Sequence, residues 1–131
     1  MIFLRGSSPL PKEKLLSLAE KTNTLLINPK KINSEEELLL AEQLAKNATK
    51  EKRNIAKKPE KEFLLWLAAK KDITSALKAY SFQSAQDILL VSSGKTKPRM
   101  LSLFQLREAP LNLKKKASPL EIERISLSRV I

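Results

Sequence analysis

Residues 63–69 of this 131-residue chain read Phe-Leu-Leu-Trp-Leu-Ala-Ala, an apolar run without a break. Pro59 lies just upstream and suits the first turn of a helix, where its missing N–H has no helical partner. A helix that is apolar on every side is either buried at the centre of a domain or covered by a partner. The run therefore predicts a core helix or a partner-binding helix, and we assign Trp66 to the core rather than to base stacking.

Strand and helix signals alternate on both sides of this run. Short apolar segments bounded by turn residues predict strands at 2–4, 24–28 and 87–92, and the alternation of Leu111 and Leu113 suggests an edge strand. Caps and helical spacing predict helices that start at Pro11, Ser34, Pro59, Asp72, Pro98 and Pro119. Ser34 and Glu37 have the spacing of a capping box. We expect an α/β (α+β) fold, a single domain over residues 1–131 with a small three- to four-stranded mixed sheet packed with about six helices.

The net charge of +11 is concentrated in two segments. Residues 46–61 hold seven basic and two acidic side chains, and residues 95–116 hold seven basic and one acidic side chain. The rest of the chain has as many acidic as basic residues. A lysine-rich surface can simply aid solubility, but two basic blocks favour a polyanionic partner, either nucleic acid or an anionic membrane surface. We expect the two segments to share one surface.

The composition excludes much of catalysis. The chain has no Cys and no His, so thiol nucleophiles, His-based triads and the commonest zinc ligands are excluded. Residues 92–96, Ser-Ser-Gly-Lys-Thr, resemble the end of a phosphate-binding loop but lack its first glycine. We expect no catalytic residue, metal, cofactor or small-molecule substrate. The chain shows neither a signal-peptide apolar region nor an 18-residue apolar run, so we expect a cytoplasmic protein with no membrane partner.

The motif that stands out begins in the first basic segment. Residues 53–78 read RNIAKKPEKEFLLWLAAKKDITSALK. This stretch resembles the small kinase-binding subunit of the KEOPS complex, the TPRKB-like (PRPK-binding) family of archaea and eukaryotes. Residues 87–92 and 122–127 resemble that family's strand and last helix. Two departures stand in the turn after the apolar run, where the family often has Gly at the position of Ala69 and Gln at the position of Asp72.

The resemblance implies a non-catalytic, regulatory subunit of the machinery that places threonylcarbamoyl on adenosine in tRNA. It implies two partners, the KEOPS kinase/ATPase and tRNA, chiefly the single-stranded 3′ end. By position, the residues expected to face RNA are Arg53, Asn54, Lys57, Lys58, Lys70 and Lys71. On charge alone, Arg99, Lys114, Lys115 and Lys116 extend this set. The candidates for kinase binding are Leu120, Ile125 and Leu127, although their pattern favours a place in the core over a binding face.

Two rival hypotheses stay open at this stage. The chain can be a general binder of nucleic acid or of anionic surfaces with no kinase partner. Because aromatic residues are few, such binding would rest on phosphate charge, which favours structured or exposed RNA over sequence-specific DNA. The chain can also be an enzyme that uses Glu62 or Asp72 as acid or base.

Overall fold

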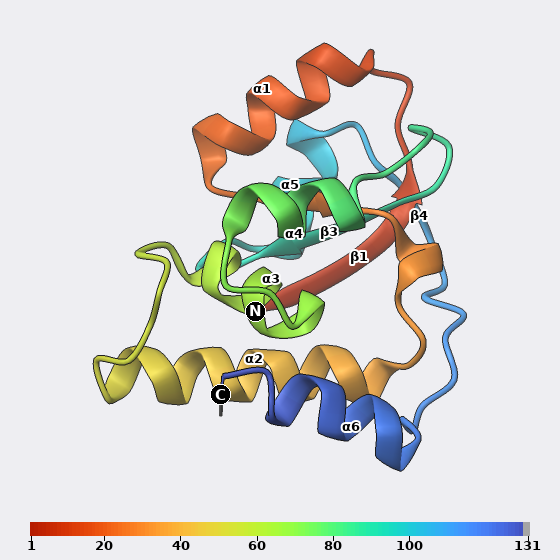
Figure 1. Ribbon diagram of the computed structural model, residues 1–131. Helices are drawn as coiled ribbons and strands as arrows, with labels where there is room; N and C mark the ends of the chain where they lie inside the picture. Colours follow the sequence, from red (N-terminus) through yellow and green to blue (C-terminus); the bar gives the residue numbers. More distant parts are fainter. Residues whose placement is uncertain (130–131) are drawn as a thin grey trace. The chain divides into compact units, whose positions relative to one another are not determined.

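The computed structural model (Figure 1) describes residues 1–129, and the chain divides into two units. The first unit consists of residues 1–29 and 81–112, and the second of residues 30–80 and 113–131. Six α-helices and four strands lie within the described residues. The predicted α+β class with about six helices is confirmed.

The first unit is built on a four-stranded sheet of order β2-β3-β1-β4. Its strands are β1 (Ile2–Ser7), β2 (Leu25–Ile27), β3 (Ile88–Ser92) and β4 (Arg107–Ala109). Every strand pair is antiparallel, so the prediction of a mixed sheet was wrong. A strand–helix–strand order usually gives a parallel pair, but here β3 lies between β1 and β2 and runs antiparallel to both.

Two helices, α1 (Lys12–Thr22) and α5 (Lys97–Leu103), pack against one face of this sheet. Their residues Leu15 and Met100 join strand residues Leu4, Leu26 and Leu90 in a buried apolar cluster. Strand β3 is buried along its whole length, as expected for an inner strand with an unbroken apolar sequence. The predicted strands and helices of this unit therefore follow from hydrophobic periodicity.

The edge strand lies a few residues before its predicted place. Strand β4 covers residues 107–109, whereas Leu111 and Leu113 lie outside the sheet. Pro110 has no N–H to continue the ladder. Beyond it, the carbonyl of Leu111 accepts a hydrogen bond from Arg5 Nη1 (2.5 Å), and Asn112 adopts a left-handed conformation. These features turn the chain away from the sheet before Leu113.

The second unit is helical, and its centre is the helix predicted from the apolar run. Helix α3 (Pro59–Ala68) packs against α2 (Glu35–Lys50), α4 (Ile73–Tyr80) and α6 (Pro119–Ser126). Residues 62–68 are all buried, including Trp66. The core interpretation of the apolar run is confirmed, because its sides are covered by three helices of the same unit.

The predicted capping box at α2 is half correct. Ser34 Oγ accepts from the N–H of Glu37 (3.2 Å), but the Glu37 carboxylate reaches Asn33 instead of Ser34. The first two backbone amides of α2 donate to carbonyls in the segment that precedes α6. Glu35 N–H donates to Lys114 O (2.9 Å) and Glu36 N–H donates to Lys115 O (3.0 Å). A complete capping box occurs at α6.

A substitution at Gly6 tests how closely β4 packs against β1. A Cβ atom at this position would lie against the carbonyl oxygen of Arg107, well inside van der Waals contact. We expect Gly6→Ala to lower the free energy of unfolding by about 1–3 kcal/mol and to speed amide exchange in β4. Urea denaturation and hydrogen exchange measure both effects.

The control is Gly94→Ala. Gly94 has open space around its Cα but a left-handed φ of 76°. This variant should cost about 1 kcal/mol through backbone strain and leave the exchange of β4 unchanged. Equal exchange in β4 for both variants would contradict the proposed close contact.

Candidate functional site

Four of the predicted RNA-facing residues lie in one loop, residues 51–58, which joins α2 to α3 in the second unit. Lys57 is exposed, Lys58 is partly exposed, and neither has an ion pair within residues 1–129. The Arg53 guanidinium contacts Glu51, with Nε and Nη2 at 2.7 and 2.6 Å from Oε2. Asn54 Nδ2 donates to the carbonyl of Ala56 (2.9 Å). Lys57 and Lys58, like Lys52 in the same loop, thus carry charges that no ion pair within the described residues compensates.

The loop is attached to α3 by Glu62, which is fully buried. Its Oε1 accepts from the backbone N–H groups of Ile55 (3.0 Å) and Ala56 (2.9 Å). Its Oε2 accepts from Trp66 Nε1 (3.0 Å) and from Arg129 Nη1 (2.6 Å). A buried carboxylate is tolerated when several donors satisfy it, and here four donors do so. Glu62 therefore links the loop, α3 and the segment after α6.

The second carboxylate considered as an acid or base also has a structural role. Asp72 Oδ2 accepts from the backbone N–H of Ser75 (2.9 Å) and from its hydroxyl (2.7 Å), so Asp72 caps the start of α4. These hydrogen bonds, first the one from the hydroxyl, lower the pKa of Asp72. The prediction that Asp72 caps this helix is confirmed. Hydrogen bonds within the fold account for both Glu62 and Asp72.

Lys70 and Lys71 lie at the other end of α3 from Lys57 and Lys58. Because α3 has 10 residues, it is about 15 Å long, and the two lysine pairs are separated by roughly that distance. Both side chains at this end are exposed. The turn begins at Ala69, which adopts a left-handed conformation with φ 55°. The departure from the family's Gly therefore falls on a residue whose backbone favours glycine.

Lys114, Lys115 and Lys116 lie at the start of α2, because the carbonyls of Lys114 and Lys115 accept from its first amides. The 51–58 loop follows the other end of this helix. Since α2 has 16 residues, about 24 Å of helix separates the two groups. Lys114 Nζ also lies 3.5 Å from Glu121. These lysines are exposed and lie at the opposite end of α2 from the loop, so their membership of one RNA-facing set stays a prediction.

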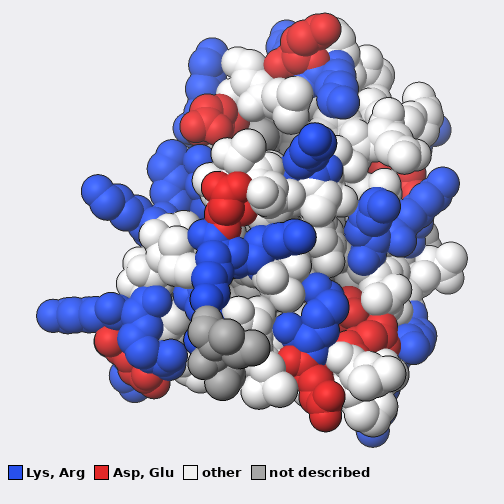
Figure 2. Space-filling model, viewed as in Figure 1, with Lys and Arg blue, Asp and Glu red and all other residues white. Residues whose placement is uncertain are grey.

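The other basic residues of the second segment belong to the first unit. Arg99 lies on α5 and is exposed, and Lys97 pairs with Glu108 (2.9 Å). Figure 2 shows Lys and Arg side chains protruding over the face in view, with acidic side chains interspersed. Because the second basic segment is divided between the two units, a surface shared with the first segment stays a prediction.

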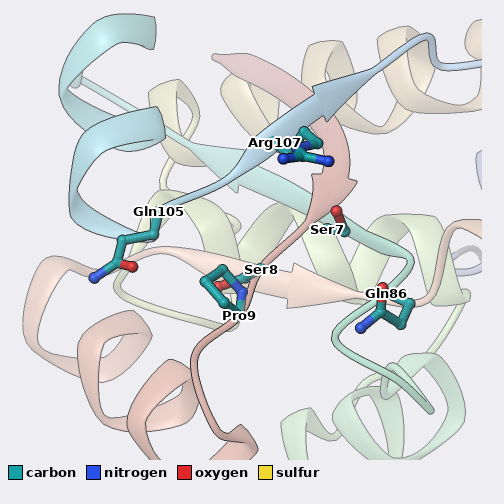
Figure 3. Close-up of a pocket in the computed structure, with 6 residues that line it drawn as sticks. All are labelled: Ser7, Ser8, Pro9, Gln86, Gln105 and Arg107. Carbon is teal, nitrogen blue, oxygen red and sulfur yellow. The ribbon is translucent and has the colours of Figure 1, made fainter.

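The first unit also has a depression of about 340 Å³ beside β1 and β4 (Figure 3). Ser7 and Arg107, which pair across these strands, line it together with Pro9, Gln86 and Gln105. The Ser8 hydroxyl donates its proton to the carbonyl of Phe104 (2.7 Å) and accepts from the N–H of Leu10 (3.2 Å), and the residue is buried, so it has no proton left to donate to a ligand. In Figure 3 the Gln105 side chain points away from Arg107. These groups do not converge on one point.

The three residues predicted to bind a kinase divide into two classes. Leu120 and Leu127 are 77% and 55% exposed, whereas Ile125 is fully buried. Leu120 lies in the first turn of α6 and Leu127 is its C-cap residue, seven positions later, so the two lie on one side, whereas Ile125 lies on the opposite side toward the core of the second unit. The assignment of Ile125 to a binding surface is therefore corrected, because its side chain is part of the core.

A second buried carboxylate also meets an arginine of α6. Glu37 accepts from Asn33 N–H and Nδ2 (both 3.2 Å), and Arg124 Nη2 lies 3.9 Å away. Burial raises the pKa of the nearby Tyr80, whose hydroxyl donates to the carbonyl of Leu67 (3.3 Å). Neither arginine partner was predicted, since Arg124 and Arg129 are distant in sequence from Glu37 and Glu62. The available signal was a Glu at the edge of an apolar run, because a carboxylate that becomes buried needs hydrogen-bond donors, of which a cation is the strongest.

Within residues 1–129, no cluster of acidic residues is large enough to hold a metal ion. No helix in this part of the chain has the length and apolar character needed to cross a bilayer. A family model described as kinase binding protein CGI-121 matches residues 8–128. A search of curated proteins finds no match. The family match spans most of the chain, including the loop, α3 and α6.

The conformation of Ala69 gives a stability test. A non-glycine residue in the left-handed region is strained, so we expect Ala69→Gly to raise the free energy of unfolding by about 0.5–1 kcal/mol. The control is Ala68→Gly, one residue earlier and still helical, which should lower it by about 1 kcal/mol. Urea denaturation measures both, and a loss of stability in Ala69→Gly would contradict the assigned turn.

Proposed function

Since the chain belongs to the CGI-121 family of kinase-binding proteins, we propose that it is the non-catalytic subunit of a KEOPS complex, where it binds the kinase/ATPase and recruits tRNA. In this role it recruits the 3′ end of tRNA for N6-threonylcarbamoyladenosine modification, and it acts in the cytoplasm. The family match carries the kinase part of the proposal. The basic loop of residues 51–58 carries the RNA part.

The 51–58 loop supports RNA binding by its charge and its attachment. Lys57 and Lys58 have no carboxylate partner within the described residues, and the backbone just before them is fixed by Glu62. Lysines that are free of ion pairs can neutralise phosphates and release counterions. Lys70 and Lys71 provide a second basic group at the other end of α3. The two groups are about 15 Å apart, so one extended single strand that crosses the surface of this unit would meet both.

The outer face of α6 supports kinase binding. Leu120 and Leu127 are large apolar side chains that lie on this face and remain mostly exposed. Exposed leucines on one helix face are typical of a protein contact. Helix α2 beside it carries a further exposed leucine, Leu39. We assign the kinase contact to this face, without Ile125.

A second candidate function is general binding of nucleic acid or anionic surfaces without a kinase. The separation of Lys114–Lys116 from the 51–58 loop favours it, because dispersed basic groups suit non-specific binding. Capture of the chain by the KEOPS kinase, tested with purified proteins, distinguishes the two functions. Absence of capture together with retained RNA binding would favour this second function.

The RNA site predicts the effect of a double charge reversal. We expect Lys57→Glu with Lys58→Glu to abolish binding of an unmodified tRNA transcript at 150 mM salt, because two cations become two anions. Replacing both lysines with Met should weaken binding and reduce the slope of log affinity against log salt by about 1.4. Fluorescence anisotropy over a salt series measures both quantities.

The control reverses two lysines outside both basic segments, Lys14 and Lys21 on α1. It makes the same change in net charge, so a purely non-specific effect would weaken binding equally. We expect the wild-type protein to bind a transcript that lacks its 3′ single-stranded end weakly. This affinity should be as low as that of the Lys57→Glu, Lys58→Glu variant for the full transcript. Equal losses in the two double variants would reject the assigned site.

The kinase surface predicts that Leu120→Glu with Leu127→Glu reduces capture by the purified kinase at least tenfold. Charged side chains cannot be desolvated in an apolar contact without a large cost. Leu16→Glu, at an exposed leucine of α1 in the other unit, should leave capture unchanged. Normal capture by the α6 variant would place the kinase contact elsewhere.

A further inference from the structure

The structure connects the end of the described chain to the loop that carries Lys57 and Lys58. Arg129 follows α6, and its Nη1 lies 2.6 Å from Glu62 Oε2. The guanidinium carbon also lies 4.2 Å from the centre of the Trp66 ring, a cation–π distance. The Arg129 side chain is 11% exposed and Glu62 is completely buried, so this contact is inside the second unit.

The two oxygens of Glu62 have different partners. Oε2 accepts hydrogen bonds from Arg129 Nη1 and the Trp66 indole, whereas Oε1 accepts from the backbone N–H groups of Ile55 and Ala56. A carboxylate is planar, so fixing Oε2 also fixes where Oε1 lies. Together with the Trp66 indole, Arg129 therefore holds the carboxylate to which the loop is attached, although no hydrogen bond joins Arg129 to the loop itself.

Only Lys57 and Lys58 lie between the two fixed points of this loop. The backbone is held at Ile55 and Ala56 by Glu62, and it becomes helical at Pro59. The carbonyl of Lys58 accepts from the N–H of Glu62 (3.0 Å), which secures the helix side. The conformational freedom of the two lysines is thus restricted to their side chains and a short piece of backbone.

Two nitrogens of the Arg129 guanidinium lack hydrogen-bond partners within residues 1–129. Its Nε and Nη2 atoms are buried and have no hydrogen-bond partner within the described residues. Buried donors without partners are rare, so the position of this side chain needs an explanation beyond hydrogen bonding alone. Stacking on Trp66 and the bond to Glu62 hold it in place.

We propose that Arg129 and Glu62 are positioning residues of the RNA site, which hold Lys57 and Lys58 ready for a phosphate backbone before RNA binds. This inference rests on the proposed function. Ordering two flexible lysines and their loop in the free protein removes a cost that would otherwise reduce affinity. The pair acts on RNA through the loop and makes no phosphate contact of its own.

The test uses the full chain with Arg129→Met, which removes the charge and keeps a long side chain. We expect faster hydrogen exchange at the Ile55 and Ala56 amides and about fivefold weaker binding of an unmodified tRNA transcript. The salt slope should be unchanged, because the number of lysines that meet phosphate is the same. Arg129→Lys, which retains the ion pair, should recover part of both losses.

Three outcomes overturn the inference. Wild-type affinity in Arg129→Met, despite faster exchange in the loop, would show that loop order does not matter for RNA. A reduced salt slope would show that Arg129 binds phosphate directly. Unchanged exchange would show that Arg129 does not hold the loop. Failure of the wild-type protein to bind the transcript overturns the proposed RNA function instead, and far-UV circular dichroism with urea denaturation confirms in each variant that the chain is folded.

Discussion

The second unit depends on the burial of one carboxylate. Glu62 lies in a helix whose next six residues are all buried and apolar, so an unpaired charge there would be strongly destabilising. Four donors from three segments remove that penalty: the 51–58 loop, the Trp66 indole and Arg129. The same contacts close the loop onto α3 and attach the segment after α6. The hydrogen bonds that stabilise the buried Glu62 carboxylate therefore also fix the backbone next to the exposed lysines of the loop.

The basic groups of this unit lie at opposite ends of its helices. Helix α3 separates Lys57 and Lys58 from Lys70 and Lys71, and α2 separates the 51–58 loop from Lys114 and its neighbours. On α6, the apolar residues divide between the core and the exposed outer face. The exposed lysines of the 51–58 loop and the exposed leucines at α6 thus belong to different elements of this unit.

Local patterns predicted most of the elements but not their partners. Pro59, Pro119 and Asp72 start helices where expected, because a missing N–H or a capping carboxylate acts within a single turn. The predicted edge strand was displaced, since pairing with β1 is decided by register and by Pro110 rather than by alternating leucines. The core assignment of residues 63–69 was correct, and Ile125 joined that core although the same spacing also allowed a binding surface.

By itself, the sequence determined the α+β class, the absence of thiol and imidazole chemistry, the two basic segments and the motif of residues 53–78. Those properties depend on composition or on residues within a few turns of one another. Only the tertiary structure decided the antiparallel strand order, the separation of the lysine groups and the pairing of Glu62 with Arg129, 67 residues away. The physical reason is that a buried charge selects its partner by proximity in the folded chain, and no local propensity encodes that proximity.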